Sequence, residues 1–307
     1  YGQRRNYSVF LKILIAIATV HRSKGNLGFL LLADLKQPAR EDSVFSWFFL
    51  QAKTRLSRTF LYQHRRFPKF APLHPAKPAD YSIHTLVQGR DVNMLILSAK
   101  SLSLSSDRAF RRFFHDDGSL SAKQIELLKT EFPDCRVITR KEADALANSR
   151  LNHYPNIAKW RTRNIYALKL IDFALWTDSS VLANIDSDIL FFKSPDFFIS
   201  LLSSRDLTPH FNRDVESFYA LDCNTIQQLF GIKILESANA GFWVMPTRYL
   251  SLDKIETWLE HPRLVAFHDL GVLEQTFAAM LACSSESGAR HFPRGYDMTP
   301  DSLSEST

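Results

Sequence analysis

Two aspartates, Asp186 and Asp188, interrupt an otherwise apolar stretch that reads VLANIDSDILFF at residues 181–192. Two carboxylates at the end of a buried strand repel each other and lose solvation unless a positive charge compensates them. Hard divalent cations are well suited to this task, because Mg²⁺ and Mn²⁺ prefer oxygen ligands and often share substrate phosphates. The pair therefore predicts a site for Mn²⁺ or Mg²⁺; the alternative is a solvated turn between two strands.

The segments around this pair alternate between short apolar runs and helical patterns. The runs at 92–99, 135–139, 181–185 and 241–245 predict strands, and helices are expected over 121–132, 163–176 and 271–281. Such alternation favours an α/β fold with a mainly parallel sheet flanked by helices. In that class, ligands bind beyond the carboxyl ends of the strands, where Asp117 and Asp186 are expected to lie.

The expected helix at 163–176 is apolar nearly all round, which predicts that it is buried. Between residues 164 and 176, Lys169 and Asp172 are the only charged residues, and their i, i+3 spacing permits an internal ion pair. Alternatively, Lys169, or Arg163 at the start of the helix, points toward an anionic group such as a diphosphate.

The basic residues are concentrated at the N-terminus. Of 38 Lys and Arg residues, 14 lie in residues 1–80, together with 4 of the 32 Asp and Glu residues. The proline-rich segment FPKFAPLHPAKPAD at 67–80 predicts a linker, so we expect a basic, aromatic, helical N-terminal extension (1–80) before a catalytic domain (81–307). Basic and aromatic residues together favour peripheral contact of residues 1–70 with an anionic membrane, and no nucleic-acid motif accompanies them. The alternative is a helical extension that faces solvent.

The apolar run VFLKILIAIATV at 9–20 is too short to span a bilayer, which takes about 20 residues. It predicts a buried or interfacial helix, with a signal peptide as the alternative. Three cysteines form no CxxC pair and are expected to be buried thiols in a reducing compartment. Together these features predict a cytoplasmic protein, with the membrane surface as a further expected location.

The segment NIDSDILFF, after an apolar strand, resembles the DxD motif of the GT-A glycosyltransferases, which use nucleotide-diphosphate sugars. The resemblance covers roughly residues 92–285, where further segments follow in the order usual for that family. It implies a GT-A-like fold and transfer of a sugar, from a UDP-sugar above all, to a glycan or lipid-linked acceptor. It also implies that Asp188 binds the metal directly and that Asp186 contacts metal or donor.

The resemblance extends to three more segments. HDDGSLS (115–121) is similar to a loop whose aspartate, here Asp116 or Asp117, contacts the nucleotide base; an Asp-Gly turn before a helix capped by Ser121 and Gln124 is the alternative. SANAGFWVMP (237–246) implies a sugar pocket with Asn239 and Gly241. HDLGVLEQTFAAML (268–281) implies a catalytic base at Glu274 or Asp269 in inverting members, whereas retaining members need none. The family often carries a basic residue before its DxD strand, which favours Lys169 or Arg163 as a donor ligand.

One feature of the family is poorly matched. Many GT-A enzymes complete the metal site with a histidine beyond the last helix, and here only His291 is available, so we expect that ligand to be missing from a truncated chain. Two alternatives remain. A haloacid-dehalogenase-type phosphatase also carries DxD, but needs Thr or Val where this chain has Leu190. A non-catalytic, membrane-associated partner protein with a GT-A-like fold is the other.

Overall fold

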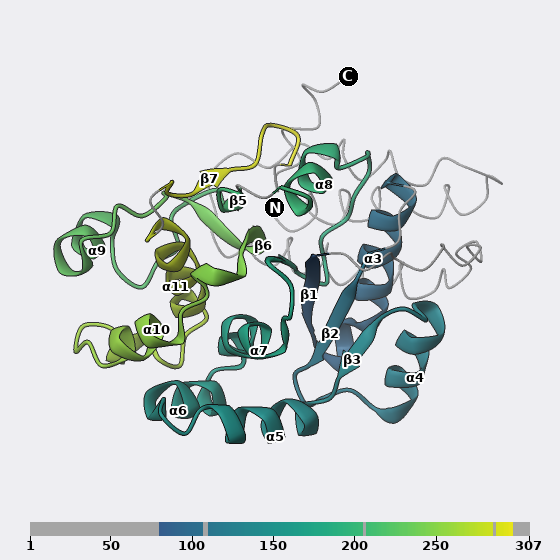
Figure 1. Ribbon diagram of the computed structural model, residues 1–307, viewed down its shortest axis with the longest axis horizontal. Coiled ribbons are helices and arrows are strands. Elements are labelled where there is room, and N and C mark those ends of the chain that lie inside the picture. The colour runs from purple at the N-terminus through teal and green to yellow at the C-terminus, as the bar shows by residue number, and fades with distance from the viewer. Residues whose placement is uncertain (1–79, 107–109, 205–206, 285–286, 297–307) are drawn as a thin grey trace, which may run out of the picture. The chain divides into compact units, whose positions relative to one another are not determined.

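The computed structural model describes residues 80–106, 110–204, 207–284 and 287–296 (Figure 1). The expected N-terminal extension, its linker and its membrane contact through residues 1–70 lie outside the described residues, so they stay predictions. In the part that is described, no helix is both long enough and apolar enough to cross a membrane.

The described residues form a seven-stranded mixed sheet in the order β3-β2-β1-β4-β6-β5-β7. The strands are β1 (Tyr81–Val87), β2 (Arg112–Asp116), β3 (Arg136–Ile138), β4 (Val181–Ile185), β5 (His210–Arg213), β6 (Ala238–Pro246) and β7 (Arg290–His291). Strands β1 to β4 run parallel, β6 runs antiparallel to both β4 and β5, and β7 pairs parallel with β5. The predicted α/β fold with a mainly parallel sheet is confirmed.

Helices flank the sheet (Figure 1). They are α3 (Val92–Ser106), α4 (Ala122–Glu131), α5 (Arg140–Arg150), α6 (Pro155–Arg163), α7 (Leu168–Trp176), α8 (Asp196–Leu202), α9 (Cys223–Phe230), α10 (Leu252–Leu259) and α11 (Val272–Cys283), with 3₁₀ turns η2 (Gly89–Asp91), η3 (Ile165–Ala167), η4 (Thr247–Tyr249) and η5 (Val265–Phe267). The three cysteines are free, as expected, but half-buried rather than fully buried.

Both faces of the central strands are covered, which explains the continuous apolar runs in the sequence. In β6, Trp243 packs in one core cluster with Phe173 of α7 and Phe277 of α11, while its neighbour Phe242 packs in a second cluster with Phe198 of α8. Successive side chains of a strand point to opposite faces, so one short segment serves both clusters.

The expectation of a strand at 92–99 is wrong, because these residues begin helix α3. A continuous apolar run is equally compatible with a buried helix, and helix α3 extends beyond the run to Ser106, further than a typical strand. The strand that was missed is β1, whose polar side chains conceal its pattern. Thr85 donates to the carbonyl of Ile185 (2.7 Å), and His84 Nδ1 is hydrogen-bonded to His115 Nε2 (2.8 Å).

The segment 163–176 contains a break that the sequence analysis did not predict. Helix α6 ends at Arg163, and Asn164 adopts an extended conformation in which its Oδ1 accepts the backbone N–H of Tyr166 (2.9 Å). Its Nδ2 donates to the carbonyl oxygens of His268 (3.0 Å) and Leu270 (2.9 Å). Asn164 therefore ties the start of α7 to the loop that precedes α11, and α7 itself is buried as predicted.

Candidate functional site

The candidate site lies where β4 ends and β6 begins. Asp186 directly follows β4, and its backbone N–H donates to the carbonyl of Gly241 (2.7 Å). Because β6 is antiparallel to β4, the first residues of β6 lie at the edge of the sheet where the parallel strands end. The topology therefore brings the DxD segment and the Asn239–Gly241 segment together, although more than fifty residues separate them in the sequence.

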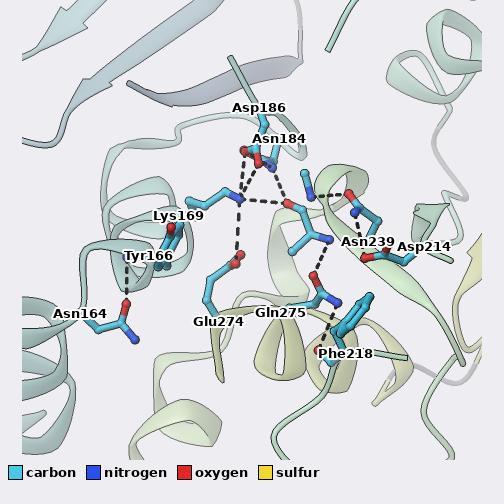
Figure 2. Close-up of polar contacts among 12 residues, drawn as sticks. Asn164, Tyr166, Lys169, Asn184, Asp186, Asp214, Phe218, Asn239, Glu274 and Gln275 are labelled. Carbon is cyan, nitrogen blue, oxygen red and sulfur yellow. Dashed lines mark hydrogen bonds and ion pairs between the residues drawn. The ribbon is translucent and has the colours of Figure 1, made fainter. Parts of the chain in front are cut away.

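The buried ammonium of Lys169 is the centre of the site (Figure 2). Its Nζ lies 2.9 Å from Asp186 Oδ1 and 3.1 Å from Oδ2, donates to the carbonyl of Ala240 (3.2 Å), and lies 3.9 Å from Glu274 Oε2. Burial by itself lowers the pKa of Lys169, but the carboxylates of Asp186 and Glu274 outweigh this effect and raise it. Lys169 is therefore a permanent positive charge inside the protein.

Glu274, in the first turn of α11, is the second carboxylate of this cluster. It is 3% exposed, and its Oε1 has no hydrogen-bond partner among the described residues. Burial raises the pKa of Glu274 to about 7; Lys169 opposes the shift and Asp186 adds to it. The side chain can therefore hold or release a proton near neutral pH, with one oxygen unpaired.

Asp188 stands apart from Lys169 on the exposed side of the segment. The atoms packed around its carboxyl raise the pKa of Asp188, and the neighbouring charge of Asp186 raises it further. Asp91, at the end of η2, contributes in the same direction; sequence analysis missed this carboxylate because it did not recognise β1. Burial is the largest cause of this rise, the carboxylates of Asp186 and Asp91 add to it, and the positive charge of Lys169 opposes it.

The carboxylates of Asp186 and Asp188 form an all-oxygen donor set, which fits a hard divalent cation. Among the residues that the structure describes, no group of three or more His, Cys, Asp or Glu side chains could hold a metal. Two carboxylates are nonetheless a sufficient protein contribution where substrate phosphates and water complete an octahedral Mg²⁺ site. His291 is engaged elsewhere, since its Nε2 is hydrogen-bonded to the carbonyl of Glu236 (2.9 Å).

The Asn239–Gly241 segment, at the start of strand β6, makes close contacts beside Asp186. Asn239 Oδ1 accepts the backbone N–H of Gly241 (2.7 Å), and its Nδ2 donates to Asp214 Oδ2 (3.1 Å). A Cβ atom on Gly241 would lie 2.9 Å from Asn239 Oδ1 and 3.1 Å from Asp186 Oδ2. Only glycine leaves both oxygens in place, so this position requires it.

The loop after β2 is held mainly by the carboxylate of Asp116. This side chain accepts the backbone N–H groups of Gly118 (2.8 Å), Leu120 (3.0 Å) and Arg140 (3.3 Å). Its burial and its backbone partners indicate a structural role for Asp116. Asp117 is half-buried and accepts the backbone N–H of Ser119 (2.9 Å), while its own N–H donates to the carbonyl of Val87 at the end of β1. The predicted capping box of Ser121 and Gln124 is confirmed.

Arg163 and Asp269 form an ion pair with each other at the surface, with 45% and 57% of their side chains exposed. No contact in the described part of the chain joins this pair to Lys169. Asp172, which the sequence analysis considered as a partner of Lys169, pairs with a different residue. Asp172 accepts two hydrogen bonds from the buried guanidinium of Arg161, at 2.6 and 2.9 Å, so the i, i+3 ion pair with Lys169 does not form.

No family model matches the sequence, and no curated protein matches it with a significant score. Similar solved structures include mouse xyloside xylosyltransferase 1 in its apo form, with 10% identity, coverage of 70% of this chain and 85% of that one, and a TM-score of 0.46. The mouse protein, like LgtC and core-mannan synthase A below, is a glycosyltransferase. Galactosyltransferase LgtC with donor and acceptor sugar analogues shares 16% identity over 68% of this chain and 72% of its own, at a TM-score of 0.46. Core-mannan synthase A from Aspergillus fumigatus, in an Mn/GDP form, shares 10% identity. The match covers 71% of this chain and 74% of that one, at a TM-score of 0.46.

Proposed function

We propose that this chain is a GT-A-type glycosyltransferase, which moves a sugar from a nucleotide-diphosphate donor, a UDP-sugar above all, to a glycan or lipid-linked acceptor. The observation that carries the proposal is the position of Asp186 and Asp188 at the edge of the sheet, with Lys169 buried behind the first and the carboxylates of Asp186 and Asp91 acting on the second. Parallel sheets bind ligands at this edge, and the donor set suits a metal–diphosphate complex.

The two aspartates have different tasks in this proposal. Asp186 is held by Lys169 and Asn184, whose Nδ2 donates to Asp186 Oδ1 (3.4 Å) and to the carbonyl of Ala240 (2.7 Å). Asp188 forms no ion pair with a described residue and would be the direct ligand of Mn²⁺ or Mg²⁺, whereas Asp186 would contact metal or donor through its partly exposed edge. A bound metal would supply positive charge that stabilises the departing nucleotide diphosphate.

The remaining donor contacts follow from the positions described above. Gly241 lets the side chains of Asn239 and Asp186 lie close to the backbone where the transferred sugar is expected, and Asn239 offers its amide to the sugar hydroxyls. Asp116 already accepts three backbone N–H groups, so Asp117 is the better placed of the two to accept an N–H of the nucleotide base. Arg163, exposed and paired with Asp269, stays a predicted donor ligand that must leave this partner in order to bind phosphate.

The acceptor hydroxyl must lose its proton as its oxygen bonds to the sugar, and two carboxylates were predicted for this role. The carboxyl of Glu274 is buried, so we assign it the positioning of Lys169, whose Nζ lies 3.9 Å from Glu274 Oε2. Asp269 is exposed and stays the predicted base, should the reaction invert the configuration of the sugar.

Titration calorimetry with UDP and GDP, with and without Mn²⁺, tests the proposal. We expect one nucleotide to bind in the presence of Mn²⁺, and Asp188→Asn to weaken that binding by about tenfold or more, since a charged ligand contributes at least about 1.4 kcal/mol. Asp134→Asn, at an exposed turn before β3, is the matched control. Failure of both nucleotides to bind with Mn²⁺, or binding that ignores both Mn²⁺ and Asp188, would overturn the proposal.

A further inference from the structure

The loop from Asp214 to Ala220, between β5 and α9, is held firmly beside the candidate site (loop 214–220). Its two ends are fixed by the bonds from Asp214 N–H to the carbonyl of Ser237 (2.7 Å) and from Ala220 N–H to Thr276 Oγ1 (2.8 Å). Ser217 Oγ accepts the N–H of Ser237 (2.8 Å), a residue that this network holds at a φ of +53°. A non-glycine residue persists in that conformation only where its surroundings enforce it.

Despite these restraints, the loop presents large apolar side chains to solvent. Val215 is 73% exposed and Phe218 is 49% exposed. The carbonyl of Phe218 accepts a hydrogen bond from Gln275 Nε2 (3.1 Å), and Gln275 Oε1 accepts the N–H of Ala240 (3.4 Å). Ala240 also contacts Lys169, so a short chain of hydrogen bonds connects the Phe218 backbone with the centre of the site.

The surroundings of the Phe218 ring combine apolar and polar groups. Figure 2 shows Phe218 next to Gln275, on the same side of the site as Asn239 and Asp214. A pyranose has C–H groups on its ring face, which are attracted to the negative face of an aromatic ring, and hydroxyl groups at its edge, which bond to carboxylates and amides. A lipid chain would instead need a continuous apolar surface, whereas Asp214, Glu216 and Ser217 interrupt this loop.

We propose that Phe218 is the stacking platform for a pyranose ring of the acceptor, held in place by loop 214–220 before the acceptor arrives. This inference rests on the proposed transferase function and adds to it the acceptor side of the site. Rigid presentation of an exposed ring lowers the entropy lost on binding, which is the physical advantage of the many backbone restraints.

Ligand-observed NMR with the methyl pyranosides of glucose, galactose and mannose, in the presence of Mn²⁺ and UDP or GDP, tests the platform. We expect at least one pyranoside to bind the wild-type protein, and Phe218→Ala to weaken its binding by about tenfold, as the loss of one aromatic contact predicts. Phe218→Trp should retain binding. Leu229→Ala, which removes an exposed apolar side chain from α9, should bind as the wild type does.

The nucleotide titration on the same variants separates this inference from the proposed function. Phe218→Ala should bind UDP or GDP with Mn²⁺ as tightly as the wild type does, and should melt at the same temperature. Pyranoside binding that is absent from the wild type or unchanged in Phe218→Ala would overturn the platform alone, as would a loss of nucleotide binding in Phe218→Ala. If pyranosides bind through Phe218 while neither nucleotide binds, the transferase function falls and a saccharide-binding surface remains.

Discussion

The ammonium of Lys169 faces both carboxylate oxygens of Asp186, at 2.9 and 3.1 Å, from inside the protein. Lys169 is 5% exposed, whereas 34% of the Asp186 side chain reaches solvent, so the pair joins the interior of the fold to its surface. The first aspartate of the DxD segment thus has a fixed internal counter-ion. Among the described residues, no cation forms an ion pair with the second aspartate, which is the physical basis for assigning the metal to Asp188.

Removal of the Lys169 charge should destabilise the fold. Lys169→Met leaves Asp186 and Glu274 without their buried partner, and we expect a loss of about 3 kcal/mol in the free energy of unfolding, as when a buried ion pair loses one member. Urea denaturation measures this loss. Lys129→Met, which removes an exposed lysine paired with Glu126, should change stability by less than about 1 kcal/mol. Equal stability of the two variants would show that the Lys169 cluster is not a structural unit.

Glu274 should make the stability of the protein depend on pH. The folded protein holds the Glu274 proton up to about pH 7, whereas the unfolded chain releases it near pH 4.5, so this stabilising contribution is complete below pH 4.5 and is lost as the pH rises to about 7. Between these limits the wild type should lose stability relative to Glu274→Gln, with a slope on the order of 1 kcal/mol per pH unit. Urea denaturation of both proteins from pH 5 to 8 measures the difference. Parallel curves would contradict the raised pKa.

Gly241→Ala should disturb the site through a single methyl group. The new Cβ would lie 2.9 Å from Asn239 Oδ1 and 3.1 Å from Asp186 Oδ2, neither of which can move freely. We expect a loss of about 1–3 kcal/mol in stability, measured by urea denaturation, and weaker nucleotide binding.

Gly271→Ala is the matched control, because the atoms nearest to its Cβ belong to the side chain of Tyr166, which is 46% exposed. This variant should cost less stability and leave nucleotide binding unchanged. A Gly241→Ala protein that is as stable and binds as well as Gly271→Ala would show that this position in β6 tolerates a side chain.

The buried Arg161 should be essential for stability although it is not part of the proposed site. Its guanidinium donates to both oxygens of Asp172, and its Nη1 donates to Asp144 Oδ1 (2.6 Å). Arg161→Met leaves the buried Asp172 unpaired, and we expect a loss of about 3–5 kcal/mol. Arg111→Met, which breaks an ion pair with the largely exposed Asp178, should lower the free energy of unfolding by about 1 kcal/mol or less. Urea denaturation of both variants measures the two losses. Similar losses in both variants would contradict the difference between buried and exposed pairs.

Features that depend on a few neighbouring residues could be predicted from the sequence. The apolar run of β4, the aspartates that follow it and the capping box of α4 are local patterns, and the structure contains the strand and the capped helix where they were expected. Strand β1 was missed for the opposite reason. The polar side chains of His84 and Thr85 are acceptable in a buried strand only because distant residues satisfy their hydrogen bonds.

By itself, the sequence determined that two carboxylates lie at the end of a buried strand in an α/β fold. Only the tertiary structure decided which buried acidic and basic side chains pair with each other. Lys169 pairs with Asp186 and Glu274 rather than with Asp172, three residues away, and Asp172 pairs with Arg161 of the preceding helix. Spacing along one helix limits only which side chains can meet, whereas the packing of α7 against β4, β6 and α11 selects the partners. The buried charges take the partners that this packing places within hydrogen-bond distance, because each one left unpaired would cost several kcal/mol.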